Sequence, residues 1–482
     1  MNSTAKREPG PAYVQPAVAI AAFVALCLVV LTVAPLLLGP DGEAYRASII
    51  AITDGHFLSL SASQAHALVA QLSLCPRSAT SCLSAGPITT LGQALEQWVR
   101  LPDGRWISEK NPGYPFLAAP FQALGLIRLA PLCYAGLGCL GLYVGARRWL
   151  GSPAGAVAVG LFCSCDLVMV FAWQDYWSSL TDASLIAAGT GALLWASLAD
   201  DVARRRRTLV GLLGILAIEA AVFARYTNVI VLGCAVVAII ALRLLRPGSL
   251  PPAAPRYWLG SAALLVAGLA AFNGLVYGAP LDTGYRPGEI AFSLGAVGPN
   301  VRFMAAHLIV AMPVFLLGLA GLILIVVGRV RLRRDDTGEG SDARRDFAVG
   351  LTMAAPWLTL WALYATYTWT AQPGIGAWQS ARFYLPAIGP ITLLASWLLV
   401  RVPQLTRWPG RTWRAAVPAA VVLVAFFALA TWTFRDQASP ASPSSPPGRC
   451  NIGEPHCPAK PPAASRANRS PSKAQVLSRL LR

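Results

Sequence analysis

The fold class follows from residues 17–38, which read AVAIAAFVALCLVVLTVAPLLL. An α-helix crosses a bilayer core of about 30 Å with about 20 apolar residues, so this run is long enough to span. A secretory signal would have a shorter apolar region followed by a small-residue cleavage site, and we therefore predict a retained membrane anchor. Because Lys6 and Arg7 precede the run, residues 1–16 are expected to stay in the cytoplasm.

The composition of the whole chain agrees with this first run. Of the 482 residues, 55% are hydrophobic and 13% are charged, about half of the roughly 25% charged residues of a globular protein. The net charge of +17 would suit nucleic acid only if the basic residues gathered on a soluble face. They lie mostly in short segments between apolar runs, so we predict a polytopic all-α transmembrane helix bundle in the lipid bilayer and no nucleic-acid partner.

About eleven runs are candidates for spans, which assigns residues 17–434 to one transmembrane domain. Their approximate ranges are 17–38, 129–146, 153–172, 179–199, 208–224, 227–245, 257–278, 303–328, 347–367, 383–400 and 414–434. The region 208–245 could instead form one re-entrant pair. With the amino end inside, 21 Lys and Arg residues fall in cytoplasmic segments and 10 fall outside before residue 435, as the positive-inside rule requires.

Two long segments lie outside these runs. Residues 39–128 join the first two spans, and a loop of this length is usually functional, so we expect it to carry the chemistry on the extracytoplasmic side. Within it, Leu91, Leu95 and Trp98 recur at helical spacing and predict an amphipathic surface helix over 87–100. Residues 112–124 are apolar but too short to span, and they predict an interfacial or re-entrant helix with Pro112 in its first turn.

The carboxyl-terminal segment 435–482 is rich in Pro and Ser and poor in large apolar residues. Such a composition cannot bury a core, so we predict a disordered tail. An odd number of spans places this tail outside the cell.

The ten cysteines form two groups. Six lie in or near spans, where Cys behaves as a small apolar residue. Cys75 with Cys82, and Cys450 with Cys457, lie in predicted extracytoplasmic segments, where the oxidising compartment favours disulfides. Neither pair offers enough ligands for zinc.

The acidic residues at the outer ends of spans are candidates for catalysis. Asp41 and Glu43 follow the first run directly and would lie in the first turn of a helix, where its dipole favours negative charge. They could be helix-capping acids or could include a general base. We expect Asp41 to be the base, with Glu43 or Asp182 orienting the acceptor.

Three further acidic residues lie in or beside predicted spans. Asp175 and Asp182 flank the entry to span 179–199 among Trp and Tyr residues, which also serve as interfacial anchors. Asp182 is the stronger candidate because an ionisable group at that depth is costly. Glu219 lies deeper, and with Arg225 it could form a purely structural pair.

Few basic residues adjoin the outer ends of spans. An Arg fork and a Lys point charge converging there would suit a phosphate group. We expect Arg382, helped by Lys110 and Arg225, to bind it. No P-loop, dinucleotide fingerprint, HExxH or GxSxG element is present in the sequence, which argues against nucleotide-driven chemistry.

Four motifs resemble the GT-C superfamily of polytopic glycosyltransferases, in particular bacterial relatives of protein mannosyltransferases and aminoarabinose transferases. The motifs are Asp41-Gly-Glu-Ala-Tyr45 with Asp54-Gly-His-Phe57, Asp103-Gly-Arg-Trp106 leading into Lys110-Asn-Pro-Gly-Tyr-Pro-Phe-Leu-Ala-Ala-Pro-Phe121, Asn273 through Tyr277-Gly-Ala-Pro-Leu-Asp-Thr-Gly-Tyr285, and Ala381-Arg-Phe-Tyr-Leu-Pro386. The resemblance covers about residues 17–400. It departs at Asn111, where many relatives have His, and at Gly42, which separates two acids that relatives keep adjacent.

The resemblance implies a polyprenyl-phosphate-linked sugar donor, used at the outer face of a bacterial plasma membrane. A lipid, glycan or protein hydroxyl would receive the sugar with inversion at the anomeric carbon. Tyr45, Tyr114, Asp175 and Tyr285 are expected to line the substrate cavity. The resemblance implies no particular cofactor and leaves a divalent cation open, because relatives differ in metal dependence and two acids near a phosphate permit either mode.

Two other classes of function would use a similar sequence. A transporter or lipid flippase also places ionisable groups near helix ends, but usually near the bilayer midplane and with internal repeats, which are not visible here. A non-catalytic assembly subunit of the cell envelope would need none of the four motifs.

Overall fold

The computed structural model describes residues 14–33, 40–56, 59–73, 95, 97–101, 103–245, 250–285, 290–332, 340–372, 375–405 and 413–438. The predicted disulfide partners Cys75, Cys82, Cys450 and Cys457 lie outside these residues. Most of the predicted tail does as well, although its first residues, 435–438, continue a helix and so correct the predicted boundary.

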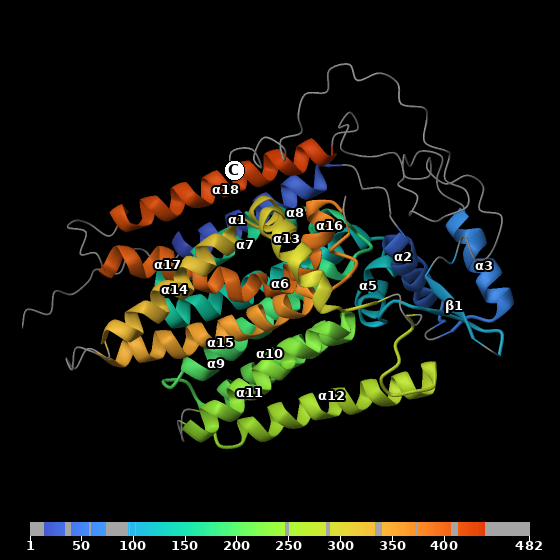
Figure 1. Ribbon diagram of the computed structural model, residues 1–482, viewed down its shortest axis with the longest axis horizontal. Helices are drawn as coiled ribbons and strands as arrows, with labels where there is room; N and C mark the ends of the chain where they lie inside the picture. The colour runs from blue at the N-terminus through green and yellow to red at the C-terminus, as the bar shows by residue number, and fades with distance from the viewer. Residues whose placement is uncertain are drawn as a thin grey trace, which may run out of the picture.

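The protein is a helical membrane protein whose long helices run side by side (Figure 1). These helices are α1 (Val14–Leu31), α6 (Ala130–Leu150), α7 (Ser152–Cys163), α8 (Asp166–Trp173), α9 (Ser178–Leu198), α10 (Arg204–Ala224), α11 (Val229–Leu245), α12 (Ala254–Tyr277), α13 (Val297–Ala311), α14 (Val314–Leu332), α15 (Gly340–Ala365), α17 (Ile388–Leu405) and α18 (Trp413–Ala438). Short 3-10 turns, η2 (Ile127–Leu129), η3 (Tyr226–Asn228) and η4 (Leu294–Ala296), precede α6, α11 and α13.

Each predicted span overlaps a helix in the described part of the chain, but the spans are not all continuous. Of the described helices, seven are long and apolar enough to cross a membrane, and the α7–α8 pair, bent by 61°, would make eight. The predicted span 303–328 is broken between α13 and α14 at Met312 and Pro313, because proline cannot donate the backbone hydrogen bond that a continuous helix needs. The count of eleven spans therefore remains a prediction, whereas 208–245 forms two separate helices.

The tightest packing in the bundle joins α6 to α9. A Cβ atom at Gly141 would collide with the backbone of Ala188, and one at Gly191 would collide with the backbone of Gly141. Small residues thus allow two helices to approach closely, as is common where lipid removes the hydrophobic drive for association. This contact lies along the middle of α9, whose amino end carries Ser179 and Asp182.

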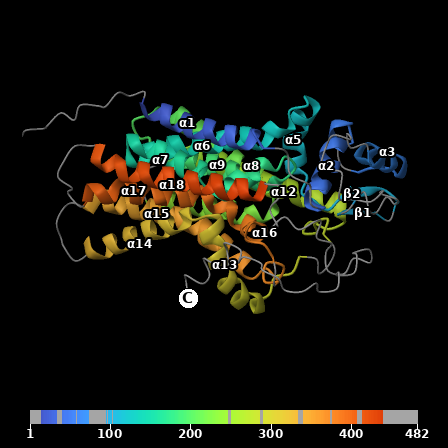
Figure 2. The ribbon, with the colours of Figure 1, turned by 90° about the horizontal axis from the view of Figure 1, so that it is seen from above.

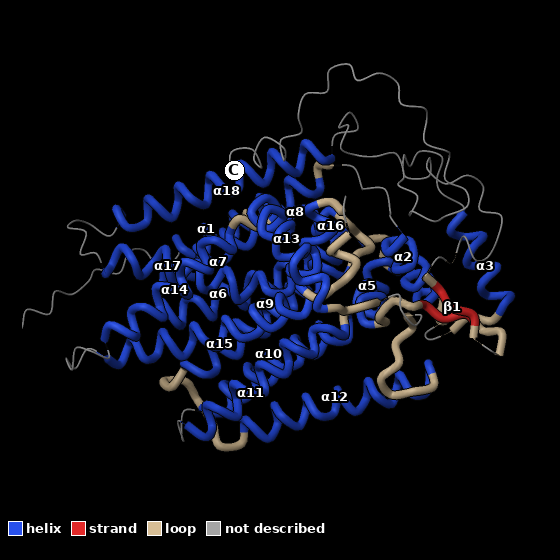
Figure 3. The backbone as a smooth tube through the Cα atoms, in the orientation of Figure 1, coloured by secondary structure: helices blue, strands red, loops and turns tan. Residues whose placement is uncertain are grey.

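A small extramembrane layer caps one end of the bundle, the right-hand end in Figures 1 and 2. It contains α2 (Pro40–Thr53), α3 (Ala62–Ser73), α5 (Gly113–Ala123) and the antiparallel ribbon of β1 (Trp98–Arg100) and β2 (Trp106–Ser108), drawn red in Figure 3. The linkers 199–203 and 250–253 lie at the opposite end. Segments predicted to face opposite sides of the membrane are thus at opposite ends, while the assignment of the cytoplasmic end remains a prediction.

The extramembrane layer confirms one local prediction and corrects another. A short helix is present where one was expected over 112–124, namely α5, with Pro112 at its N-cap, while its interfacial or re-entrant placement stays a prediction. The prediction of a surface helix over 87–100 is wrong for the residues that the structure describes at its carboxyl end, because Trp98–Arg100 is strand β1. Backbone pairing of Trp98 with Ser108 outweighs the helical spacing of the apolar residues, since both strands bury a side chain against α2 and α3.

Candidate functional site

The start of α2 presents Asp41 and Glu43 in its first turn, where the helix dipole favours negative charge. The two side chains have different partners. Asp41 meets three donors from other parts of the chain, whereas Glu43 pairs with Arg46 at 3.5 Å, three residues along the same helix. Burial raises the pKa of Glu43, and Arg46 opposes that rise. Glu43 is therefore separate from the partners of Asp41.

The β1–β2 ribbon positions Lys110 against Asp41. The ribbon pairs Trp98 with Ser108, and the Ser108 hydroxyl then accepts the backbone N–H of Lys110 at 3.1 Å. From this turn the Lys110 ammonium reaches Asp41 Oδ1 at 2.8 Å and lies 5.3 Å from the centre of the Tyr285 ring. The sequence motif that contains Lys110 is thus oriented by strand pairing rather than by a helix.

Arg382 reaches the same carboxylate from the opposite end of the sequence. It follows the short helix α16 (Ala377–Ala381) and opens the 3-10 helix η5 (Arg382–Ala387). Its guanidinium lies 2.9 Å from Asp41 Oδ2 and is 4.6 Å from the ring centre of Trp177, 5.3 Å from that of Trp369 and 4.8 Å from that of Phe383. Cation–π contacts of this kind hold the planar guanidinium in a fixed orientation.

The three groups form a cluster with an excess positive charge. Side-chain exposures are 7% for Lys110, 12% for Arg382 and 20% for Asp41, so one carboxylate neutralises only one of two largely buried cations. Burial by itself would raise the pKa of Asp41, but Lys110 and Arg382 together hold that pKa well below its usual range. The arrangement suits an incoming anion, which would supply the missing negative charge.

A second charged pair lies at the start of α9. Asp182 is fully buried, its Oδ2 lies 2.8 Å from Arg225 Nε, and it accepts a hydrogen bond from Asn228 at 3.2 Å. Arg225 also donates to the Ser179 hydroxyl at 2.8 Å. Arg225 is predicted to bind a phosphate and Asp182 to orient the acceptor, whereas in the structure the two side chains pair with each other.

Tyrosine side chains surround the first cluster. The Tyr45 hydroxyl is 3.0 Å from that of Ser178, and burial raises the Tyr45 pKa, an effect that Lys110 opposes. Burial likewise raises the pKa of Tyr285 despite the nearby Lys110, and it raises the pKa of Tyr367 to about 12. These neutral phenols can donate or accept hydrogen bonds without adding charge to the cluster.

The remaining predicted cavity residues, Tyr114 and Asp175, are engaged with each other. The buried Tyr114 hydroxyl donates to the backbone carbonyl of Asp175, and its ring packs edge-on against Tyr45 at 5.4 Å. Burial raises the pKa of the Asp175 carboxyl to about 6, with Arg128 opposing the rise. These contacts join the loop before α9 to α5 and give both residues a structural explanation.

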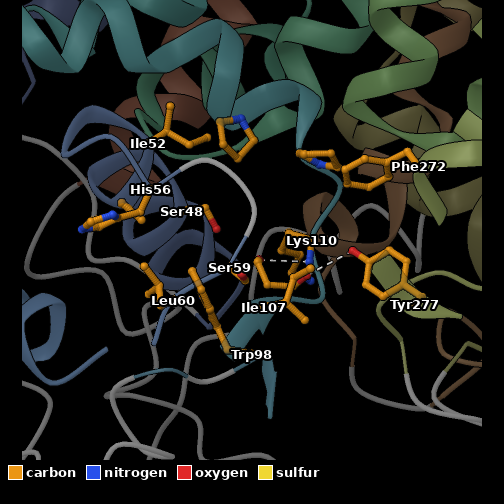
Figure 4. A pocket seen from close by; sticks show the side chains of 14 residues that line it. Ser48, Ile52, His56, Ser59, Leu60, Trp98, Ile107, Lys110, Phe272 and Tyr277 are labelled. Atoms are coloured by element: carbon orange, nitrogen blue, oxygen red, sulfur yellow. Dashed lines mark hydrogen bonds between the residues drawn. The ribbon is translucent and has the colours of Figure 1, made fainter. Parts of the chain in front are cut away.

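A shallow pocket lies beside Lys110, between α2, the ribbon and α12 (Figure 4). Its lining includes Ser48, His56, Trp98, Phe272 and Tyr277, and the Tyr277 hydroxyl donates to the Ser108 carbonyl at 3.3 Å. The pocket thus combines aromatic faces with neutral polar groups.

Sequence reasoning missed Gln97, whose side-chain N–H donates to Asp41 Oδ1 at 2.9 Å. No motif indicated it, since Gln97 lay within the predicted surface helix. Reasoning from motifs also missed Ser179 and Asn228, because only the folded chain brings them to the Asp182–Arg225 pair.

A metal site is not formed by the described part of the chain. Among those residues, no three His, Cys, Asp or Glu side chains are placed to hold a metal ion. Two cations beside Asp41 also disfavour a divalent cation there, because like charges repel.

Comparison with known proteins identifies the fold. No protein-family model and no curated protein matches the sequence. The apo oligosaccharyltransferase of Archaeoglobus fulgidus superposes with a TM-score of 0.53 at 10% identity, over 88% of this chain, and its complex with zinc and sulfate with a TM-score of 0.50 at 12% identity over 86%. ArnT from Cupriavidus metallidurans bound to undecaprenyl phosphate gives 0.49 at 13% identity, covering 87% of this chain and 69% of ArnT.

The match extends over only part of the archaeal protein. The chain spans 56% of the length of the apo oligosaccharyltransferase and 53% of its complex with zinc and sulfate. The helical bundle is GT-C-like, as the resemblance in the sequence implied.

Proposed function

On the premise of a GT-C-like fold, we propose that this protein is a membrane glycosyltransferase. It moves a sugar from a polyprenyl-phosphate-linked donor to an acceptor hydroxyl at the outer face of the plasma membrane. The single observation that carries the proposal is Asp41, held between Lys110 and Arg382 at the membrane-proximal start of α2. The shared fold with an oligosaccharyltransferase supports the transferase class.

The two cations supply the chemistry that a phosphate leaving group needs. Arg382 offers a planar fork and Lys110 offers a point charge, and both are largely removed from water. As the sugar departs, negative charge grows on the phosphate. Fixed cations in a site of low dielectric constant stabilise this charge more in the transition state than in the ground state.

Donor binding also prepares the base. In the absence of donor, Asp41 is a weak base because both cations hold its carboxylate. A phosphate that binds the same cations shares their charge, so the pKa of Asp41 rises toward its ordinary value and the carboxylate can accept a proton. The base is thus activated only when the donor is in place.

The reaction then proceeds by a single nucleophilic displacement at the anomeric carbon. Asp41 takes the proton of the acceptor hydroxyl, and the hydroxyl oxygen forms a bond to the anomeric carbon. The bond from that carbon to the phosphate oxygen breaks, and its electron pair stays on the polyprenyl phosphate. Attack from the face opposite the leaving group inverts the anomeric configuration.

The proposal is tested by transfer of labelled sugar. Purified protein in lipid nanodiscs is incubated with synthetic polyprenyl-phosphate sugars and with lipid, glycan and protein fractions of a bacterial envelope. Label is expected in one acceptor fraction with the parent protein and with the matched control Glu43→Gln, because Glu43 lies apart from the partners of Asp41. Failure of the parent protein to transfer any of the sugars, while the purified protein remains folded, refutes the proposal.

A further inference from the structure

Gln97 has an unusual backbone for its residue type. Its φ is +62°, and it is the only non-glycine residue with a positive φ in the described part of the chain. This left-handed region is disfavoured for residues that carry a Cβ atom, and such outliers gather at functional sites. The position therefore calls for a reason why glycine is not used.

The ribbon explains how Gln97 is held. It directly precedes β1, and its backbone carbonyl accepts the N–H of Glu109 at 2.8 Å, one step beyond the pair of Trp98 with Ser108. The same strand pairing carries Lys110. Gln97 and Lys110 consequently approach Asp41 together, and both donate to its Oδ1, at 2.9 and 2.8 Å.

In the Gln97 side-chain amide, only the NH₂ group has a hydrogen-bond partner among the described residues. A carboxylate can only accept, so the amide NH₂ must face Asp41 and the amide oxygen must point away from it. That Oε1 is buried and has no hydrogen-bond partner among the described residues. Buried acceptors are rarely left unsatisfied, and one placed beside the proposed base suggests a donor that arrives with a ligand.

We infer that Gln97 is a substrate-contacting residue, with its N–H orienting Asp41 and its Oε1 accepting a hydrogen bond from a hydroxyl of a bound sugar. The inference rests on the proposed function and names one chemical class, a polyhydroxylated ligand. One hydroxyl would meet Asp41, and a neighbouring hydroxyl would meet Gln97. The adjacent pocket is lined by Lys110 and by the aromatic rings of Trp98, Phe272 and Tyr277 next to serine hydroxyls, a combination of apolar faces and hydrogen-bonding groups that suits a sugar ring.

The test is a cycle between enzyme variants and deoxy substrates. Gln97→Met keeps the length of the side chain and removes both polar atoms, and its matched control is Gln122→Met on α5, where Gln122 accepts a hydrogen bond from Tyr176 at 3.1 Å. With the parent enzyme, removal of one specific hydroxyl from the substrate should lower kcat/KM about tenfold to hundredfold. With Gln97→Met, kcat/KM should be the same for the deoxy compound and for the full substrate. Deoxy donors and deoxy acceptors are tested separately, and this assigns the hydroxyl to one of the two.

Gln97→Gly separates function from architecture. Glycine adopts a positive φ freely, so the melting temperature should equal or exceed that of the parent while kcat/KM falls at least tenfold. A merely structural glutamine would give the opposite pair of results.

Each result has a defined meaning. An active parent whose Gln97→Met variant keeps full activity, or discriminates deoxy substrates as the parent does, overturns the inference alone and leaves a water molecule as the partner of Oε1. A parent that transfers no sugar overturns the proposed function and this inference with it. Loss of activity in Gln122→Met equal to that in Gln97→Met also counts against a specific contact.

Discussion

Replacing Asp41 with asparagine should strengthen donor binding while abolishing transfer. In the parent, the donor phosphate must share Lys110 and Arg382 with the Asp41 carboxylate, which lies 2.8 and 2.9 Å from their nitrogens. Asp41→Asn removes this competitor and nearly keeps the shape of the side chain. The phosphate then meets Lys110 and Arg382 without competition from the Asp41 carboxylate.

The magnitude follows from the geometry of the cluster. A pair of unit charges about 4 Å apart interacts with about 4 kcal/mol at an effective dielectric constant near 20, and desolvation offsets much of this. If loss of the competing carboxylate makes the free energy of phosphate binding more favourable by about 1.4 to 2.8 kcal/mol, the Kd for polyprenyl phosphate falls about tenfold to hundredfold. Loss of the base should meanwhile lower turnover by about 10² to 10⁴.

Stability gives an independent readout of the same variant. Without ligand, Asp41→Asn leaves Lys110 and Arg382 mostly buried without their carboxylate, which should cost about 3 to 5 kcal/mol. Polyprenyl phosphate at 100 times its Kd would restore about 2.7 kcal/mol. Because its Kd is lower, the variant should gain more in melting temperature than the parent at the same ligand concentration.

The assay combines three measurements on protein in nanodiscs. These are equilibrium binding of polyprenyl phosphate, ligand-dependent melting and single-turnover sugar transfer, with Glu43→Gln as the comparison variant, which should depart from the parent less than Asp41→Asn does. Weaker phosphate binding together with near-normal transfer in Asp41→Asn would show that Asp41 neither competes with the phosphate nor acts as the base.

Three further predictions concern the phosphate, pH and topology. Arg382→Lys keeps the charge but loses the fork and the planar stacking on three rings, so the Kd for polyprenyl phosphate should rise at least tenfold; equal binding by Arg382→Ala would remove Arg382 from the site. The pKa of Asp175 is raised to about 6, so the folded state holds its proton more tightly than the unfolded state, and stability falls as pH rises from about 4 to about 6. Asp175→Asn should lack this fall, so that it is more stable than the parent by about 2 to 3 kcal/mol at pH 8 but not at pH 4. If the thermal stability of the variant and of the parent depended on pH in the same way, titration of Asp175 would be excluded as the cause. Reporter fusions at Asp103 and Asp342 should give opposite signals, because the 21 to 10 distribution of basic residues places them on opposite sides of the membrane; the same signal at both positions would contradict the topology.

Several features could be predicted from the sequence because they depend on neighbours along the chain. Long apolar runs predict helices, since backbone groups in lipid must satisfy each other within the segment. The helix start at Asp41 and the short helix after Pro112 follow from local signals of the same kind, and both are present in the structure. Asp41, Lys110 and Arg382 each come from a sequence motif and meet in the structure, whereas Arg225, expected beside Lys110 and Arg382, pairs with Asp182.

Only the tertiary structure decided how these residues are paired. Lys110 and Asp41 are 69 residues apart, and their contact depends on the register of a ribbon whose first strand has the spacing of a helix. The same ribbon places Gln97, whose role no local pattern could indicate. Arg225 and Asp182 are 43 positions apart in the sequence, and only the folded chain brings their side chains to 2.8 Å. Periodicity reports which side of an element is apolar, whereas the partner of a buried charge depends on which distant element fills the space beside it.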